Sequence, residues 1–482
     1  MLNTLLIIGL VPFLLALLIN IPNILKSYSS VRGKLFWFSV ACAAMFIGQG
    51  QMFSHAGYSA TSSEFGAGIY YQLGWMLFAG VLLSSLLLTT GFSAGARRLP
   101  IIMLLIYAVI GIATSGYSPA IMFSIYKSSQ VFLDFILIVV AVYLLVKHER
   151  PELVFNLTIF LLSLVILSAA LGGVLIPELA YRELYGVGAF GHTLNGVYPQ
   201  VHSNELGLLS AALVVVSLRR SAEKELGKTR RFYWLSLCLL SLVVLIGAQA
   251  RTSIFSLTLS LLVMTYLLPK LRWVSVALVL GVVCIGFYYV ISGSQLGVEG
   301  DVTNYLRRGS SDEQLQTISG RTELWKVGWK MLEASPLFGH GFQAGVRMSG
   351  GEFGLPSGTN MHNGHMQVLV DSGLVGYIAW ILYVIPMLWL AMSVLKKQYF
   401  PIKALTGRFH LEVCLVMFII FFRTFLGQIL VTHQISTLLF LGGYIYVLTN
   451  GIILHLRDKD KTETQQRDFN RVIKKGSYDF KK

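Results

Sequence analysis

Two arginines and a histidine stand where they could act on a phosphorylated ligand. Arg251 lies in a short turn between two apolar blocks, Arg321 opens a polar stretch, and His362 precedes another apolar block. A guanidinium group binds phosphate oxygens through planar, paired hydrogen bonds. A histidine of near-neutral pKa can take a proton from an attacking hydroxyl or, when charged, hold a phosphate oxygen. These residue types therefore predict a site for an anionic ligand.

Each of these residues also has a structural interpretation. Arg251 could be a helix-end arginine that reaches lipid headgroups, and His362 could pack against a helix or cap it. His362 and Asn363 open an expected helix, whose first amides would favour an anion nearby. His365 lies one turn further along the same expected face, but no carboxylate or cysteine stands at ligand spacing beside this pair. We therefore predict no metal site and no cofactor.

The elements that must position these residues are membrane-spanning helices. Hydrophobic residues make up 55% of the chain and charged residues 13%, and the apolar residues form blocks of roughly 17–25, long enough to span a bilayer as a helix. A barrel would alternate apolar and polar residues, whereas 161–175 and 274–289 are apolar on all sides. The sequence predicts an all-α, polytopic protein of about 12–13 transmembrane helices, with the first retained rather than cleaved as a signal peptide. The expected spans are 4–20, 35–51, 69–90, 100–117, 120–146, 153–176, 204–218, 232–248, 252–268, 273–292, 366–394, 409–429 and 436–455.

Basic connections alternate along the chain with connections that hold few lysines or arginines. By the positive-inside rule the basic set is cytoplasmic. This accounts for most of the net charge of +15 through topology and contact with membrane lipids, and we predict no nucleic-acid partner. The basic set comprises Lys26, Arg32, Lys34, Arg97, Arg98, Lys147, Arg150, Arg219, Arg220, Lys224, Lys228, Arg230, Arg231, Lys270, Arg272, Lys396, Lys397, Lys403, Arg408 and the tail from Arg457.

The opposite face collects the connections 52–68, 177–203 and 293–365. The last is long enough for a small domain, and loops of that length are usually functional. Within it, 321–333 predicts a short amphipathic helix at the membrane surface, with Leu324, Gly328, Met331 and Leu332 on one face. The predicted regions are 1–176 (N-terminal helices), 177–292 (helices with the extracytoplasmic loop 177–203), 293–365 (large periplasmic loop), 366–455 (C-terminal helices) and 456–482 (basic cytoplasmic tail).

Several cations oppose the topology rule, because they lie in the membrane or on the extracytoplasmic face. Such charges must be offset, and an anionic ligand such as a lipid pyrophosphate would do so. These residues are Lys127, Arg182, Arg251, Arg307, Arg308, Arg321, Lys326, Lys330, Arg347 and Arg423.

The spacing of His362-Asn363, nine residues, Gly373, two residues and Gly376 resembles the signature of the O-antigen ligase and polysaccharide polymerase family. Further matching pieces, all within about 190–380, are His202-Ser-Asn204-Glu-Leu-Gly207, Gln249-Ala-Arg251-Thr-Ser, Gly320-Arg321-Thr-Glu-Leu-Trp325 and Ser335-Pro-Leu-Phe-Gly339-His340-Gly341. His202 departs from the family pattern, so we give it little weight. The N-terminal helices and the tail match only in hydropathy.

The resemblance implies a GT-C-like, inverting and metal-independent glycosyltransferase at the periplasmic face of the bacterial inner membrane. The donor would be a glycan on undecaprenyl pyrophosphate. By the resemblance, Arg251 and Arg321 would hold the pyrophosphate, and His362 would activate the acceptor hydroxyl or orient the phosphate. The other expected partners are a glycan or lipid A-core acceptor, a chain-length regulator and a flippase. The expected substrate-binding residues are Arg182, Asn204, Asn363, His340 and Arg347.

Three functions compete. A polymerase would extend another lipid-linked repeat and a ligase would use the lipid A core; the Asn-Gly after His362 and the run Leu-Val-Asp-Ser-Gly-Leu-Val-Gly favour the polymerase. A transporter or flippase should carry charges deep within several helices, and only Lys127, Asp134 and Arg423 meet that expectation. The large outer loop would also be unexplained in a transporter.

Overall fold

The computed structural model describes residues 30–49, 67–90, 97–183, 192–197, 199–223, 225–267, 276, 321–355, 360–396 and 405–479. Nearly all of these residues are helical, which confirms the all-α class. The expected helix 4–20, and 273–292 apart from residue 276, lie outside the described residues. The main helices are α2 (Val31–Ile47), α3 (Ala67–Thr90), α4 (Leu99–Thr114), α5 (Ile121–Lys147), α6 (Leu153–Leu175), α8 (Ser203–Ser221), α9 (Lys228–Gly247), α10 (Arg251–Leu267), α14 (Arg321–Ala334), α15 (Gly364–Lys396), α16 (Leu405–Arg423) and α17 (Ile435–Asp479).

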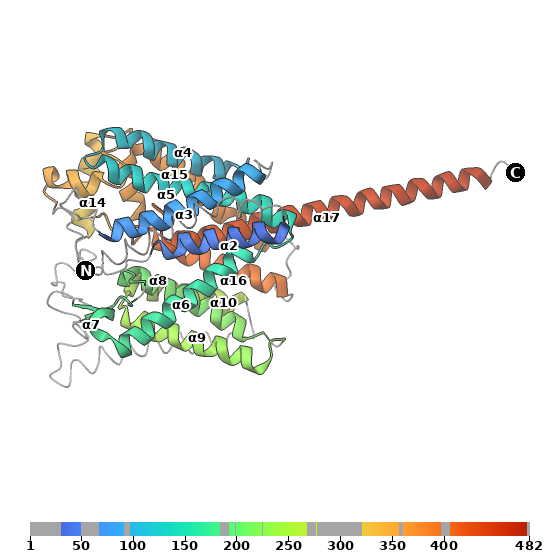
Figure 1. The fold of residues 1–482 in the computed structure, drawn as a ribbon, viewed down its shortest axis with the longest axis horizontal. Coiled ribbons are helices and arrows are strands. Elements are labelled where there is room, and N and C mark those ends of the chain that lie inside the picture. Colours follow the sequence, from blue (N-terminus) through green and yellow to red (C-terminus); the bar gives the residue numbers. More distant parts are fainter. Residues whose placement is uncertain are drawn as a thin grey trace.

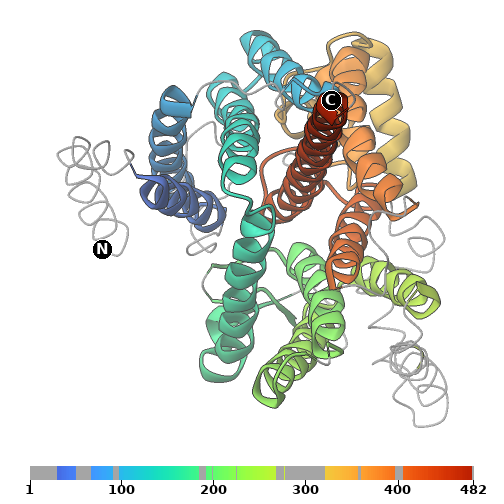
Figure 2. The ribbon, with the colours of Figure 1, turned by 90° about the vertical axis from the view of Figure 1, so that its right-hand side faces the viewer.

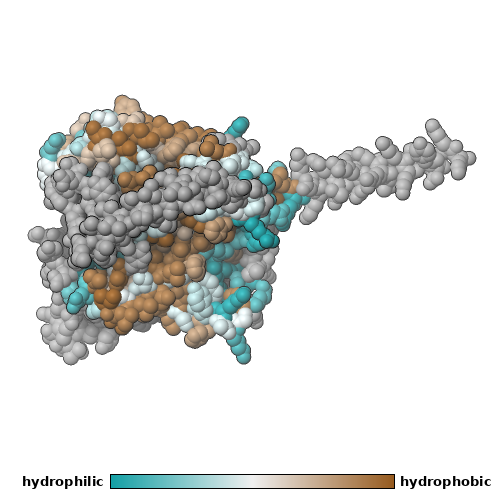
Figure 3. Space-filling view, in the orientation of Figure 1, coloured by the Kyte–Doolittle hydropathy of each residue, from teal (hydrophilic) through white to brown (hydrophobic). Residues whose placement is uncertain are grey.

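The helices form one bundle (Figures 1 and 2). Seven described helices are long and apolar enough to cross a membrane. Large side chains such as Leu88 and Val174 are 88% and 79% exposed, as lipid-facing residues would be, and apolar colouring covers much of the visible surface (Figure 3). The chain is therefore a multi-pass membrane protein, as the sequence predicts.

The two ends of the bundle differ in composition. We call them the α14 end and the α17 end, after the helix that lies at the first and the helix that leaves the second (Figure 1). Two ion pairs join the expected cytoplasmic connections at the α17 end: Arg408 with Glu225 at 3.8 Å, and Arg457 with Glu149 at 2.5 Å. Hydrophilic residues gather where α17 emerges (Figure 3). The described connections that these ion pairs join thus meet on one side.

Short elements occupy the α14 end. The connection after α6 holds α7 (Pro177–Ala180) and an antiparallel pair of three-residue strands, β1 (Tyr181–Glu183) and β2 (His192–Leu194). Between α14 and α15 lie a π-helix, η4 (Gly345–Ser349), and a 3₁₀-helix, η5 (Gly350–Phe353). The amphipathic helix predicted at 321–333 is confirmed as α14, whose Gly328, Met331 and Leu332 are buried.

Helix α15 breaks at Gly373, where the expected span 366–394 was continuous. Gly373 has φ 64°, and its neighbours bond outside the helix: Leu374 N donates to Pro336 O at 2.9 Å and Val375 N to Leu337 O at 3.1 Å. A Cβ on Gly373 would collide with the Leu337 carbonyl. Glycine is therefore required here both for its conformation and for this close approach.

The expected helix 409–429 is wrong at its C-terminal end, because α16 stops at Arg423. The following segment is apolar, which favours a helix, but side chains of a neighbouring helix donate hydrogen bonds to its backbone. Leu430, at φ 61°, accepts from Trp380 Nε1 at 2.7 Å and from Tyr383 Oη at 3.0 Å. Irregular backbone within a membrane protein is tolerated where protein groups satisfy it in this way. After this segment, α17 continues as a helix to Asp479, through most of the predicted tail.

The expectation that Lys127, Asp134 and Arg423 are the only charges deep within the helices is also wrong. Glu412 is 0% exposed and Asp371 1% exposed. Both lie within apolar sequence. Glu412 accepts from Arg220, 192 residues away, and Asp371 accepts from Gln367 and from Val346 N, contacts that hydropathy does not reveal.

Candidate active site

The three residues predicted to be catalytic converge at the α14 end, each at or beside a helix terminus. Arg251 is the first residue of α10, Arg321 is the first residue of α14, and His362 lies two residues before α15. Two further residues join them: Arg423 at the end of α16, and His202, the N-cap of α8. We call these five residues the outer cluster.

A single carbonyl oxygen links two guanidinium groups of the outer cluster. Leu426 O accepts from Arg321 Nη1 at 3.2 Å and from Arg423 Nη1 at 2.7 Å. Burial and the neighbouring charge of Arg251 lower the pKa of Arg321, so the positive charges repel one another. Within the described residues Arg321 forms no ion pair. A bound anion would relieve this repulsion.

His362 is held in an unusual backbone conformation beside these arginines. Its φ is 46°, and its amide donates to Asn360 Oδ1 at 3.0 Å. The preceding residue is fixed on both sides, since Met361 O accepts from Trp325 Nε1 at 2.9 Å and Met361 N donates to Gln367 Oε1 at 3.0 Å. A strained residue that its surroundings hold in place is typical of functional sites.

The electrostatic surroundings make His362 neutral at ordinary pH. Burial lowers its pKa to about 4, assisted by the charges of Arg321, His202 and Arg423. A neutral imidazole can accept a proton from a hydroxyl, and a nearby bound anion would make the resulting imidazolium more favourable. The geometry therefore allows general-base chemistry next to a phosphate-binding group.

His365 does not share a face with His362, so the interpretation of a histidine pair is wrong. The positive φ of His362 places it outside the helix, which begins at Gly364. Both His365 nitrogens face hydroxyl groups, Tyr377 Oη and Thr424 Oγ1, each at 3.1 Å. Its ring stacks on Phe425 at 4.5 Å. His365 thus packs α15 against the segment after α16. In the described part of the chain no three His, Cys, Asp or Glu residues are grouped as a metal site requires.

Two of the predicted substrate-binding residues lie at helix starts close to the outer cluster. Asn363 caps α15, with Oδ1 accepting from Met366 N at 3.1 Å. Asn204 is the second residue of α8, and its amide donates to Nδ1 of the N-cap His202 at 3.2 Å. His202 received little weight in the sequence, yet its charge acts on His362. The indication in the sequence was its position at the start of the motif that also contains Asn204.

The other three predicted substrate-binding residues lie apart from one another. Arg182 is exposed on β1, opposite Thr193 of β2. His340 Nε2 is 2.7 Å from Met331 O, which ties the loop to the end of α14. Arg347 lies in η4, with its Cζ 5.5 Å from the centre of the Phe123 ring. Their roles in substrate binding remain predictions.

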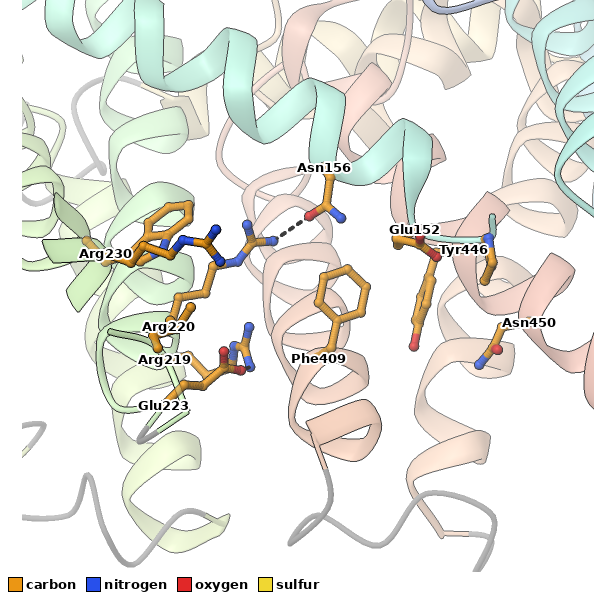
Figure 4. Close-up of a pocket in the computed structure, with 12 residues that line it drawn as sticks. Glu152, Asn156, Arg219, Arg220, Glu223, Arg230, Phe409, Tyr446 and Asn450 are labelled. Carbon is orange, nitrogen blue, oxygen red and sulfur yellow. Dashed lines mark hydrogen bonds and ion pairs between the residues drawn. The ribbon is translucent and has the colours of Figure 1, made fainter. Parts of the chain in front are cut away.

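A second group of arginines lies at the α17 end and lines a cavity of about 580 Å³ (Figure 4). Glu412 of α16, fully buried, pairs with both Arg219 and Arg220 of α8, the second at 2.7 Å. Arg220 also donates to Asn156 Oδ1 at 2.7 Å and lies 4.9 Å from the Trp234 ring. Arg219 pairs in addition with Glu223. We call Arg219, Arg220, Glu223 and Glu412 the inner cluster.

Residues 236–381, which contain Arg251, Arg321, His362 and the break in α15, match the family model described as O-antigen ligase. No curated protein matches the chain. The family match confirms the resemblance to the O-antigen ligase and polymerase family. It supports a glycosyltransferase activity of O-antigen ligase or polymerase type in general for this multi-pass membrane protein.

Proposed function

We propose, from the place of residues 236–381 in the O-antigen ligase and polymerase family, that the protein polymerises lipid-linked oligosaccharide repeats. The donor would be a glycan on undecaprenyl pyrophosphate. The observation that carries the proposal is the meeting of Arg251, Arg321 and His362 at one end of the bundle. The end opposite the basic connections would face the periplasm of a bacterial inner membrane.

In the proposed step, an acceptor hydroxyl oxygen attacks the anomeric carbon of the donor sugar from the side opposite the pyrophosphate. The bond from that carbon to the phosphate oxygen breaks, and the pyrophosphate leaves with the electron pair. The hydroxyl proton passes to the neutral His362 ring. Attack from the opposite side inverts the anomeric configuration.

The arginines supply the remaining stabilisation. Negative charge grows on the departing pyrophosphate, and fixed guanidinium donors in a partly buried site stabilise it more than water would. Arg321 is anchored by the Leu426 carbonyl, so little reorganisation is needed when the anion forms. No step in this scheme uses a metal, and we expect transfer to survive EDTA.

A ligase is the second candidate, because the matching family model is described as O-antigen ligase. Polymerase and ligase need the same donor site and differ in the acceptor. The test uses purified protein in lipid nanodiscs with a lipid-linked oligosaccharide, with and without lipopolysaccharide core. Growth of the lipid-linked glycan without core supports the polymerase, and transfer only onto the core supports the ligase. Movement of the lipid across liposome membranes without a new glycosidic bond would overturn both in favour of a transporter.

A further inference from the structure

A second pair of cations lies at the α14 end, around one aromatic ring. Lys127 Nζ of α5 is 5.8 Å from the centre of the Phe123 ring, and Arg347 Cζ of η4 is 5.5 Å from the same centre. The two positive charges act on each other through space. Lys127 also lies 5.1 Å from the centre of the Tyr126 ring. We call Lys127, Arg347 and Phe123 the α5–η4 pair.

Protein groups satisfy this pair only in part. Lys127 Nζ donates to Gln130 Oε1 at 3.2 Å, while Arg347 Nε is buried and has no hydrogen-bond partner among the described residues. Neither side chain forms an ion pair within the described part of the chain. Two neighbouring like charges, half-buried at the edge of a membrane protein, favour an anion between or beside them.

The carboxylates whose charges act on the pair already have other partners. Asp371, whose charge acts on Arg347, accepts from Val346 N at 3.1 Å and from Gln367 Nε2 at 2.6 Å. Glu205, whose charge acts on Lys127, accepts from Ser436 N at 3.2 Å and from Ser436 Oγ at 3.1 Å. Asp371 thereby holds the start of η4, and Glu205 the start of α17. These acids position the backbone and leave the cations available to a ligand.

The pair is close to the outer cluster but distinct from it. Arg347 lies in the loop that Arg321 and His362 flank in the sequence, and Glu205 acts electrostatically on both Lys127 and Arg423. Met122 and Ile125, which lie on another face of α5 than Lys127, are 65% and 40% exposed and mark the lipid-facing side of this helix.

We propose that the α5–η4 pair binds the phosphate or pyrophosphate of the lipid-linked acceptor, while the outer cluster holds the donor pyrophosphate. This inference rests on the proposed function, since it assigns the second substrate of that reaction. Two anionic lipids must be bound together for a bond to form between their glycans, and their charges repel. A separate set of cations for each lipid, with the sugars between the two sets, lets the protein bind donor and acceptor at the same time.

Binding stoichiometry tests the inference without any reaction. Native mass spectrometry of the detergent-solubilised protein with undecaprenyl pyrophosphate should show two bound lipids. The double variant Lys127→Gln/Arg347→Gln should bind one, and Arg321→Gln should also bind one, at the remaining site. The matched control Lys147→Gln/Lys326→Gln should bind two, because Lys147 contacts Tyr143 at the opposite end of α5 and Lys326 is 70% exposed on α14. Undecaprenol, which lacks phosphate, should not bind at either site.

The same measurement with lipid A identifies the source of the acceptor phosphate. If the wild-type protein binds one undecaprenyl pyrophosphate and one lipid A, and the Lys127/Arg347 variant loses only the lipid A, the site serves a ligase acceptor. If it loses one undecaprenyl pyrophosphate, the site serves a polymerase acceptor. Wild-type stoichiometry for both lipids in the folded variant would overturn the inference, as would loss of every bound lipid.

A transfer assay separates failure of the inference from failure of the proposed function. The donor carries a blocked non-reducing hydroxyl, so that it cannot act as acceptor. We expect the double variant to raise the acceptor KM at least tenfold and to leave the donor KM unchanged. An unchanged acceptor KM would overturn the inference while transfer itself persists. Absence of transfer in the wild-type protein would instead overturn the proposed function, and the stoichiometry would stand by itself.

Discussion

The outer and inner clusters are both rich in arginine, yet they are built in opposite ways. In the inner cluster, Arg219 and Arg220 lie in the last turn of α8 and share the buried carboxylate of Glu412. In the outer cluster, Arg321 and Arg423 sit at helix ends and share a neutral carbonyl, Leu426 O. The inner arrangement is complete without a ligand, whereas in the outer one the charges of Arg251 and Arg321 act against each other.

We expect this difference to separate structural arginines from functional ones. A buried ion pair satisfied on both sides joins helices, and removal of one partner leaves an uncompensated charge. Cations that repel one another raise the energy of the free protein, and an anionic ligand would recover that energy on binding. The count of arginines in a region therefore says little until their partners are known.

The largest expected effect falls on the inner cluster. Glu412→Ala would leave Arg219 and Arg220 without their shared carboxylate, and we expect it to lower the free energy of unfolding by about 3–5 kcal/mol. Unfolding by denaturant, followed by circular dichroism in detergent micelles, measures this. The control is Arg408→Gln, whose partner Glu225 is exposed and 3.8 Å away, with an expected change below about 1 kcal/mol. Equal, small changes in both variants would contradict the structural role of the inner cluster.

The outer cluster should respond in activity and not in stability. Arg321→Ala should lower kcat by about 10²–10³-fold, the usual cost of removing one donor to a developing anion. Arg321→Lys should retain the charge but recover only part of the rate, because an ammonium cannot make two planar hydrogen bonds. Single-turnover transfer measures the rate at equal amounts of folded protein.

The control for the outer-cluster variants lies on the same helix. Lys326→Ala removes an exposed cation paired with Glu323 and should leave transfer unchanged. Wild-type transfer by Arg321→Ala and by Arg251→Ala would show that both arginines anchor the protein to headgroups, and the proposed site would then be wrong.

A third prediction concerns the backbone that carries the outer cluster. Gly373→Ala forces a Cβ into the Leu337 carbonyl at φ 64°, and we expect a loss of about 1–3 kcal/mol in stability. Because the displaced segment 335–341 connects α14 to the loop before His362, transfer should fall as well. Gly451→Ala is the control, since nothing lies within 4 Å of a Cβ there. Equal stability of the two variants would show that the break in α15 adapts freely.

The sequence predicted the outer cluster better than the inner one, for a physical reason. Charge placed against the topology rule, together with motif spacing, singled out Arg251, Arg321 and His362. The inner arginines agreed with the topology rule, so nothing in the sequence linked Arg220 to Glu412, which is 192 residues away.

Other features depended on tertiary contacts that periodicity does not encode. The end of α16 at Arg423 depends on carbonyls bonded by α15, and the contribution of His202 depends on the approach of α8 to His362. Helix positions followed from hydropathy because each span must be apolar and satisfy its own backbone. The polar connections, which carry the proposed site, have no such constraint.

The smallest expected effect is a shift in the pH dependence of transfer, and it tests whether the outer cluster acts as one electrostatic unit. Burial and the neighbouring cations hold the pKa of His362 at about 4. If the neutral ring is the base, kcat/KM should stay level as the pH falls through 6.5 and should decline only near pH 4. His202→Asn keeps a good helix N-cap and removes one cation, so the pKa of His362 should rise and the decline should move to higher pH by less than about one unit.

Stability has to be followed in parallel with this profile. The unfolded chain binds a proton at His362 near the ordinary pKa of 6.5, and the folded protein does so near 4. Folding stability should therefore decrease as the pH falls across that interval, and kcat/KM is taken only where the protein remains folded. A wild-type decline centred near 6.5 would contradict a neutral, buried His362. An identical profile for His202→Asn would show that His202 caps α8 without acting on the site, and the outer cluster would then comprise only the three arginines and His362.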